Sequence, residues 1–191
     1  VKGKLPPVGR NVQRSTSNVQ RRTPENCIES LQLNVGRWTL DVGRFPSSFR
    51  MTPPKILIAP SILAADFSNL ETEIHRAEEA GADWLHLDIM DGHFVDNISF
   101  GPAVVATVRK HTKLPLDVHL MIERPDHYLP RFLEAGANSI TVHVESESRH
   151  EVPETLAAIR AAGCGVGLTL NPATPFDVVA PYLEAIDLLL I

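Results

Sequence analysis

The sequence predicts an α/β protein, a (β/α)8 TIM barrel that is incomplete here, with about strands 1–6 present. From Lys55 onward, short apolar runs alternate with segments of helical period, and this order requires a parallel sheet. The predicted strands have one aliphatic and one polar face, whereas strands of an open doubly wound sheet are apolar on both. No glycine-rich phosphate fingerprint follows the first strand, which disfavours a dinucleotide-binding fold.

Six apolar runs are predicted to form the strands. They are Ile56–Ala59, Trp84–Met90, Leu116–Met121, Ile140–Val144, Val166–Leu170 and Asp187–Ile191. The alternation is clear in the second, where Leu85, Leu87 and Ile89 share one face and His86 and Asp88 share the other. The aliphatic face suits a surrounding layer of helices, and the polar face suits the mouth of a barrel, where such folds have their active sites.

Five helical segments are predicted between the strands. The first begins at Ser68, with Glu71 completing a capping box, and the last is a short helix near Phe176–Leu183. For the three between them, Pro102 opens one, Asp126 caps the next and Pro153 opens the third. Three helices are followed by Gly81, Gly136 and Gly163, and glycine at that point favours the left-handed conformation that ends a helix.

Composition and charge limit the class of protein. The 191 residues are 43% hydrophobic and 21% charged, as in an ordinary soluble domain. No run approaches the roughly 18 apolar residues of a membrane helix. The net charge of −5 combines +6 in residues 1–50 with −11 in residues 51–191, and an acidic body argues against nucleic-acid binding. Two cysteines, Cys27 and Cys164, do not make a disulfide framework, which favours a cytoplasmic location.

Residues 1–50 differ from the rest of the chain. They are rich in Arg, Ser, Asn and Pro, and they show no sustained helix or strand period. Such acid-poor N-termini resemble transit peptides, but no amphipathic helix is visible in this one. We therefore interpret residues 1–50 as a disordered or non-native N-terminal extension. Residues 51–191 are predicted to form the partial β/α barrel domain.

Three residues on neighbouring strands are predicted to bind a divalent metal ion. His86 and Asp88 are one strand repeat apart on the same face, and His119 comes from the next strand at a similar height. Two imidazoles and one carboxylate suit Zn²⁺, Fe²⁺, Mn²⁺ or Co²⁺ better than Ca²⁺. An isolated His-x-Asp is more often a structural pair, but His119 and the Asp91-Gly92 turn favour the metal site.

Five other residues are placed at the same end of the predicted barrel. Ser61 follows the first strand and either contacts substrate or merely ends the strand. Met90 and Met121 either pack in the core or form a polarisable wall at the mouth. His143 and Glu145 face inward, and the pattern favours a functional and a structural role equally.

Longer motifs resemble a known family. The segment Leu85–Asn97 closely resembles the signature of ribulose-phosphate 3-epimerases. Ala59–Leu63 and Leu116–Met121 resemble the first and third strands of that family, and Asn171–Pro175 resembles the loop after its fifth strand. The resemblance covers about Lys55–Ile191 and implies a barrel of the ribulose-phosphate-binding type.

The resemblance also implies a reaction and a role for each matched residue. Enzymes of this family interconvert D-ribulose 5-phosphate and D-xylulose 5-phosphate in the pentose phosphate pathway, through an enediolate whose charge one divalent metal ion can stabilise. Asp88 matches the proton acceptor and a metal ligand, while His86 and His119 match metal ligands. Ser61 and His119 match substrate contacts. The implied partner is a pentulose 5-phosphate, with neither nucleic acid nor membrane, and the protein is compatible with a homo-oligomer.

The match to the family ends within the sixth strand. A second aspartate, which acts as proton donor and metal ligand, follows strand seven of the family, and glycine-rich phosphate loops follow strands six to eight. We therefore expect the 191-residue chain to be a fragment that is a poor enzyme, or inactive, by itself. Two alternatives stay open, a 3-epimerase of a six-carbon ketose phosphate such as allulose 6-phosphate, and a non-catalytic remnant module.

Overall fold

The computed structural model describes residues 31–35, 38–42 and 55–191, in two units, Val1–Pro53 and Pro54–Ile191. In the first unit, β1 (Leu31–Val35) and β2 (Trp38–Val42) pair antiparallel. We expected no regular structure before residue 51, and β1 and β2 show that this expectation is wrong for residues 31–35 and 38–42. The sequence does contain a short alternation of apolar and polar residues in each strand, which could have indicated them. The prediction that residues 1–50 are a disordered or non-native extension otherwise lies outside the described residues.

The second unit contains a sheet of five parallel strands whose order in space follows their order in the chain. The strands are β3 (Leu85–Met90), β4 (Leu116–Met121), β5 (Ser139–His143), β6 (Gly165–Thr169) and β7 (Leu188–Leu190). Each agrees with a predicted strand to within one residue at either end. The parallel sheet predicted from the strand–helix alternation is therefore confirmed.

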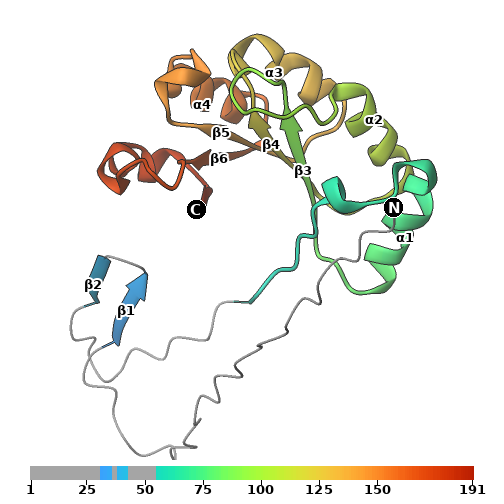
Figure 1. Cartoon of the computed structure of the whole chain (residues 1–191), viewed down its shortest axis with the longest axis horizontal. Helices are drawn as coiled ribbons and strands as arrows, with labels where there is room; N and C mark the ends of the chain where they lie inside the picture. The colour runs from blue at the N-terminus through green and yellow to red at the C-terminus, as the bar shows by residue number, and fades with distance from the viewer. Residues whose placement is uncertain (1–30, 36–37, 43–54) are drawn as a thin grey trace, which may run out of the picture. The chain divides into compact units, whose positions relative to one another are not determined.

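Helices lie along one side of this sheet. They are α1 (Leu70–Glu79), α2 (Pro102–His111), α3 (Pro125–Glu134) and α4 (Val152–Ala161). Figure 1 shows the four helices as an arc outside the strands, whereas an open doubly wound sheet has helices on both faces. The arrangement is that of an incomplete β/α barrel wall. No helix in the described part of the chain is both long and apolar enough to cross a membrane.

The core lies between the helices and the aliphatic faces of the strands. On β3, Leu85, Leu87 and Ile89 are buried, while the residues between them are partly exposed. The helices contribute buried residues to the same core, among them Ile74, Val105, Val108, Leu129, Phe132, Leu156 and Ile159. The predicted difference between the two faces is confirmed on β3, whose polar face is left free to line a site, whereas β4 and β5 are buried on both faces except at Met121.

The first predicted strand, Ile56–Ala59, is not formed. The segment runs beside β3, where the Asp83 N–H donates to the Ile58 carbonyl (2.8 Å) and the His86 N–H donates to the Pro60 carbonyl (3.0 Å). A regular ladder is interrupted because Pro60 has no N–H and because the Ile58 N–H donates to the Asp83 side chain instead. The segment therefore approaches β3 through a few hydrogen bonds only.

Two predicted helix starts are wrong. A 3₁₀ turn precedes α1, and its cap is Asp66, whose carboxylate accepts from the Ser68 N–H, so Ser68 does not open a capping box. Helix α3 begins at Pro125, and Asp126 lies inside the first turn, where it pairs with Arg124. In both places a neighbouring acid or proline competes with the expected cap.

The ends of the helices follow the prediction more closely. Gly81, Gly136 and Gly163 have φ values of 89°, 98° and 74°, the left-handed conformation expected after a helix. The predicted fifth helix is wrong in type, because it consists of two 3₁₀ segments, Phe176–Val178 and Ala180–Ala185. These segments are too short to add a full helix to the barrel wall.

Candidate active site

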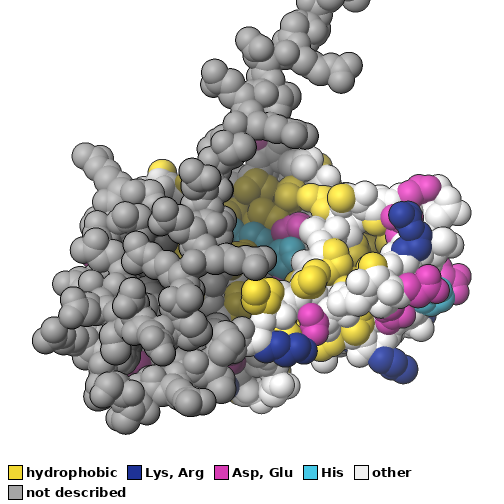
Figure 2. Space-filling view, turned by 90° about the horizontal axis from the view of Figure 1, so that it is seen from below, with side chains coloured by type: hydrophobic (Ala, Val, Ile, Leu, Met, Phe, Trp, Pro, Cys, Tyr) yellow, Lys and Arg dark blue, Asp and Glu magenta, His cyan; other side chains and the backbone are white. Residues whose placement is uncertain are grey.

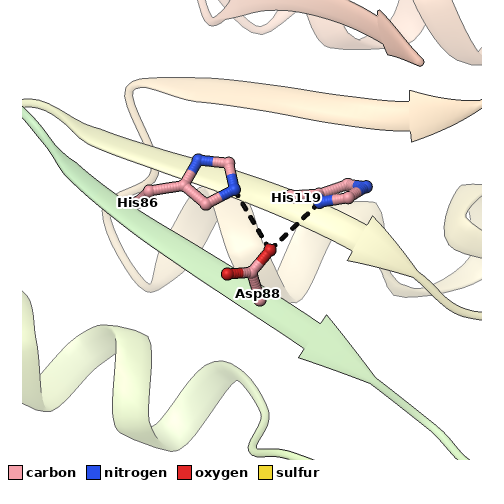
Figure 3. A group of neighbouring side chains, drawn as sticks. All are labelled: His86, Asp88 and His119. Carbon is pink, nitrogen blue, oxygen red and sulfur yellow. Dashed lines mark hydrogen bonds and ion pairs between the residues drawn. The ribbon is translucent and has the colours of Figure 1, made fainter. Parts of the chain in front are cut away.

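The fold brings His86, Asp88 and His119 together, as predicted. His86 and Asp88 lie on β3, and Asp88 is the register partner of His119 on β4. Asp88 Oδ1 is 3.1 Å from His86 Nε2 and 3.1 Å from His119 Nδ1 (Figure 3). The carboxylate oxygen therefore lies between two imidazole nitrogens from neighbouring strands.

The same three atoms suit a divalent metal ion. One ligand atom from each residue lies within 4.8 Å of the others. In their neutral forms both imidazole nitrogens offer lone pairs, as the carboxylate does, and a cation relieves the repulsion among them. The donor set of two nitrogens and one oxygen is typical of Zn²⁺, Fe²⁺, Mn²⁺ and Co²⁺ sites in proteins. The residues present thus fit the predicted ion.

The group is shielded but accessible. The His86 and Asp88 side chains are each 16% exposed and that of His119 is 10% exposed. Figure 2 shows histidine and acidic side chains in a hollow bordered by hydrophobic side chains. Partial removal from water strengthens electrostatic interactions in the group, while a small ligand can still reach it.

Ser61 contacts the other carboxylate oxygen. Its Oγ donates to Asp88 Oδ2 at 2.5 Å and accepts from the Leu63 N–H at 3.2 Å. A single parallel bridge between Ser61 and His86 holds the segment against β3. The structure thus places Ser61 next to Asp88, and its predicted contact with substrate stays a prediction.

The contacts of the group shift its protonation. Burial alone lowers the pKa of His86, but hydrogen bonds to Asp117 and Asp88 outweigh it and raise the pKa to about 9. Burial alone raises the pKa of Asp88, but hydrogen bonds from His119, His86 and Ser61 outweigh it and hold that pKa far below its ordinary value. Without a metal ion, His86 is therefore protonated and Asp88 ionised at neutral pH. An ion that binds His86 Nε2 must displace a proton.

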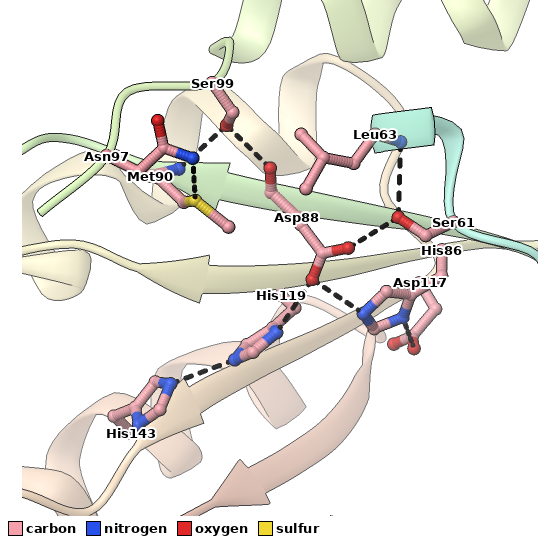
Figure 4. A network of polar contacts seen from close by, with 10 residues as sticks. All are labelled: Ser61, Leu63, His86, Asp88, Met90, Asn97, Ser99, Asp117, His119 and His143. Atoms are coloured by element: carbon pink, nitrogen blue, oxygen red, sulfur yellow. Dashed lines mark hydrogen bonds and ion pairs between the residues drawn. The ribbon is translucent and has the colours of Figure 1, made fainter. Parts of the chain in front are cut away.

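Each histidine of the group has a further partner at its other nitrogen (Figure 4). His86 Nδ1 is 2.8 Å from Asp117 Oδ2. His119 Nε2 is 3.0 Å from His143 Nε2, and His143 Nδ1 is 2.9 Å from Glu145 Oε2. Such outer partners of metal-binding histidines fix the tautomer and the ring orientation.

Two of the contacting residues were missed from the sequence. Asp117 has the same inward parity as His119 two residues later, and that parity was an available signal. Ser99 Oγ donates to the Asp88 carbonyl at 2.7 Å and accepts from the Met90 N–H at 3.0 Å, which ties the loop after β3 back to the strand. No local pattern indicates Ser99, because its partners lie 9 and 11 residues away.

The two methionines lie at the ends of their strands. Met90 and Met121 are register partners on β3 and β4, and both are partly exposed. Met90 Sδ accepts from Asn97 Nδ2 at 3.4 Å. Their place at the strand ends agrees with the expected mouth of the barrel, and their role as a wall around substrate stays a prediction.

The sequence of this chain is similar to those of known proteins. The sequence model of the ribulose-phosphate 3 epimerase family matches residues 57–191. The ribulose-phosphate 3-epimerases of Synechocystis sp. and Bacillus subtilis are 51% and 48% identical to it, each over 136 residues. The chain belongs to the ribulose-phosphate 3-epimerase family. Another relative, the chloroplastic ribulose-5-phosphate-3-epimerase of Arabidopsis thaliana, is 44% identical over 142 residues.

The chain spans little more than half the length of these family members. The alignments cover 71%, 71% and 74% of this chain and 59%, 62% and 50% of the Synechocystis, Bacillus and Arabidopsis proteins. A solved phospho-2-dehydro-3-deoxyheptonate aldolase of Thermotoga maritima is similar with a TM-score of 0.52 at 13% identity. The structural alignment covers 82% of this chain and 42% of the aldolase, and the similarity concerns the fold alone.

Proposed function

We propose that this chain carries the metal-binding part of an active site that interconverts D-ribulose 5-phosphate and D-xylulose 5-phosphate. The observation that carries the proposal is the position of Asp88 Oδ1, 3.1 Å from both His86 and His119, in a chain of the epimerase family. Epimerisation beside a ketone needs a base at the carbon and positive charge near the oxygen. A carboxylate next to a metal-binding group supplies both.

The proposed metal ligands are His86 Nε2, His119 Nδ1 and Asp88 Oδ1. A single divalent ion, Zn²⁺, Fe²⁺, Mn²⁺ or Co²⁺, is compatible with these atoms. When bound, the ion would stabilise negative charge that develops on the substrate oxygen, an effect worth several kcal/mol. The remaining chemistry is assigned to side chains of the chain itself.

The two oxygens of Asp88 have different surroundings, which suggests different tasks. Oδ1 faces the two histidines, while Oδ2 accepts a hydrogen bond from Ser61. We assign Oδ2 as the oxygen that takes the proton from C3 of the substrate. The Ser61 hydroxyl and His119 are the proposed substrate contacts, because Ser61 meets Oδ2 directly and His119 lies beside Oδ1. Inversion also needs a second acid on the opposite face of the carbon.

Exchange of the C3 proton with solvent tests this proposal. The chain is loaded with Zn²⁺ or Co²⁺ and mixed with D-ribulose 5-phosphate in D₂O, and deuterium at C3 is followed by NMR. We expect metal-dependent exchange that a chelator abolishes and added metal restores. Exchange needs only one base, so it reports on Asp88 without requiring the second acid. If a chain holding one ion exchanges no faster than free metal in buffer, the proposal is wrong.

No observation favours the six-carbon substrate or the non-catalytic module, and we propose neither. The pentulose 5-phosphate remains the proposed substrate. We also keep the homo-oligomer and the cytoplasmic location as proposals. One rice relative is described as a cytoplasmic isoform and the Arabidopsis relative as chloroplastic, so members of the family occur in more than one compartment.

A further inference from the structure

His143 links the candidate metal group to the next part of the barrel. It lies at the end of β5 and is 4% exposed. Its ring meets that of His119 edge to edge, with centroids 5.1 Å apart and 21° between the planes, and it packs against the Phe94 ring with centroids 4.5 Å apart. Figure 4 shows His119 between His143 and Asp88. The ring is therefore held by packing against Phe94 and by its edge contact with His119.

Hydrogen bonding fixes which nitrogen of His143 carries the proton. Glu145 Oε1 accepts from the Asn171 N–H (2.6 Å) and from the Thr174 hydroxyl (2.7 Å). Glu145 Oε2 faces His143 Nδ1 at 2.9 Å, so Nδ1 is the donor in that contact. In the neutral ring the remaining nitrogen, Nε2, then offers a lone pair to His119.

The same reasoning assigns the proton of His119. The two Nε2 atoms are 3.0 Å apart, and one must donate to the other. Because His143 Nε2 is the acceptor, His119 Nε2 carries the hydrogen. With a metal ion in place of the proton between His119 Nδ1 and Asp88 Oδ1, Nδ1 would then present its lone pair to the ion. That is the tautomer a metal ligand at Nδ1 requires.

We propose that His143, held by Glu145, is a positioning residue that fixes the His119 tautomer and turns Nδ1 toward a divalent metal ion. This inference rests on the metal site of the proposed function. Asp117 contacts His86 in a similar way. Its carboxylate lies 2.8 Å from His86 Nδ1 directly, whereas Glu145 acts on His119 through His143. Through Glu145 the contact also extends to Asn171 and Thr174 after β6.

Binding of Co²⁺ to the full 191-residue chain tests the role of His143. The affinity and the visible d–d absorption of bound Co²⁺ are measured for the wild type, His143→Phe and His143→Gln. Phenylalanine keeps the ring packing against Phe94 but offers no acceptor, so we expect affinity to fall about 10- to 100-fold and the absorption bands to shift. The glutamine carbonyl can accept from the His119 N–H, so His143→Gln should recover part of the loss.

Two further variants guard against a purely structural effect. His150→Gln is the matched control, because His150 Nε2 forms its 2.9 Å hydrogen bond with the backbone carbonyl of His143 and not with a ring nitrogen. We expect its affinity to stay within about twofold of the wild type. Glu145→Ala leaves His143 in place but removes its anchor, and we expect a weaker loss with bands shifted in the same direction. If His143→Phe fails to fold, Glu145→Ala still tests whether His143 positions His119.

Two outcomes would overturn the inference in distinguishable ways. If the wild type binds Co²⁺ while His143→Phe and Glu145→Ala bind it equally well with unchanged bands, His143 has no positioning role and the metal site of the proposed function stands. If the wild type itself binds no Co²⁺, both the positioning role and the metal site are wrong.

Discussion

Replacing Asp88 by asparagine is expected to weaken metal binding by more than about 100-fold and to slow C3 proton exchange by about 1,000-fold or more. Asp88 is the one residue of the group that contacts both histidines and Ser61. The amide keeps the shape of the side chain but has no negative charge, so it is a weaker metal ligand and cannot act as the base. Metal affinity follows from competition with a coloured chelator, and exchange follows from NMR in D₂O.

The matched control for this change is Asp96→Asn. Asp96 lies in the loop six residues after the end of β3, within the same family signature, and it is exposed. The substitution is chemically identical, and we expect both metal affinity and exchange to stay within about twofold of the wild type. Equal losses in Asp88→Asn and Asp96→Asn would show that the effect is not specific to the site.

Gly167→Ala is expected to destabilise the fold by about 3 kcal/mol or more. Gly167 on β6 is the register partner of Thr141 on β5. A Cβ atom at Gly167 would lie 2.8 Å from Thr141 Cβ and 3.0 Å from Thr141 Cα, and it would also overlap Thr141 Oγ1. Rotation about χ1 moves Oγ1 but leaves Cβ and Cα in place, so the two strands must separate. Urea unfolding of the metal-free proteins measures the loss.

Two comparisons make this prediction specific. Gly101→Ala is the control, because a Cβ atom there meets nothing within 4 Å and its φ of −135° suits any residue. We expect it to cost less than about 1 kcal/mol. Thr141→Ala removes Oγ1, so the double variant with Gly167→Ala should lose less stability than the two single variants combined. A Gly167→Ala protein as stable as Gly101→Ala would contradict the observed strand spacing.

The parts of the fold that follow from local pattern were predictable from sequence. Strands β3 to β6 each bury an aliphatic face and β7 is a short apolar run, so the alternation or apolar run is visible in a few residues. The parity of His86 and Asp88, with His119 on the next strand, predicted that these three side chains lie together, as they do. Parallel strands in register turned that parity into proximity, since Asp88 and His119 became partners.

The features that were wrong or missed depend on contacts that local pattern does not show. The segment Ile56–Ala59 has a strand-like composition, but Pro60 and the Asp83 carboxylate change its hydrogen bonding. Asp117 was missed and the role of His143 was left open, because their contacts come from other strands, at separations of 31 and 24 residues. Parity suggested that both side chains face inward, but only the structure shows what they contact.

X-ray absorption at the zinc edge of the Zn²⁺-loaded chain determines which atoms of His86, Asp88 and His119 bind the ion. We expect one ion per chain, with two imidazole ligands and further oxygen ligands at about 2.0–2.2 Å. In His119→Ala we expect the imidazole signal to fall to that of one histidine. Bound zinc with no imidazole signal, or with an unchanged signal in His119→Ala, would contradict the assignment of His86, Asp88 and His119 as the metal site.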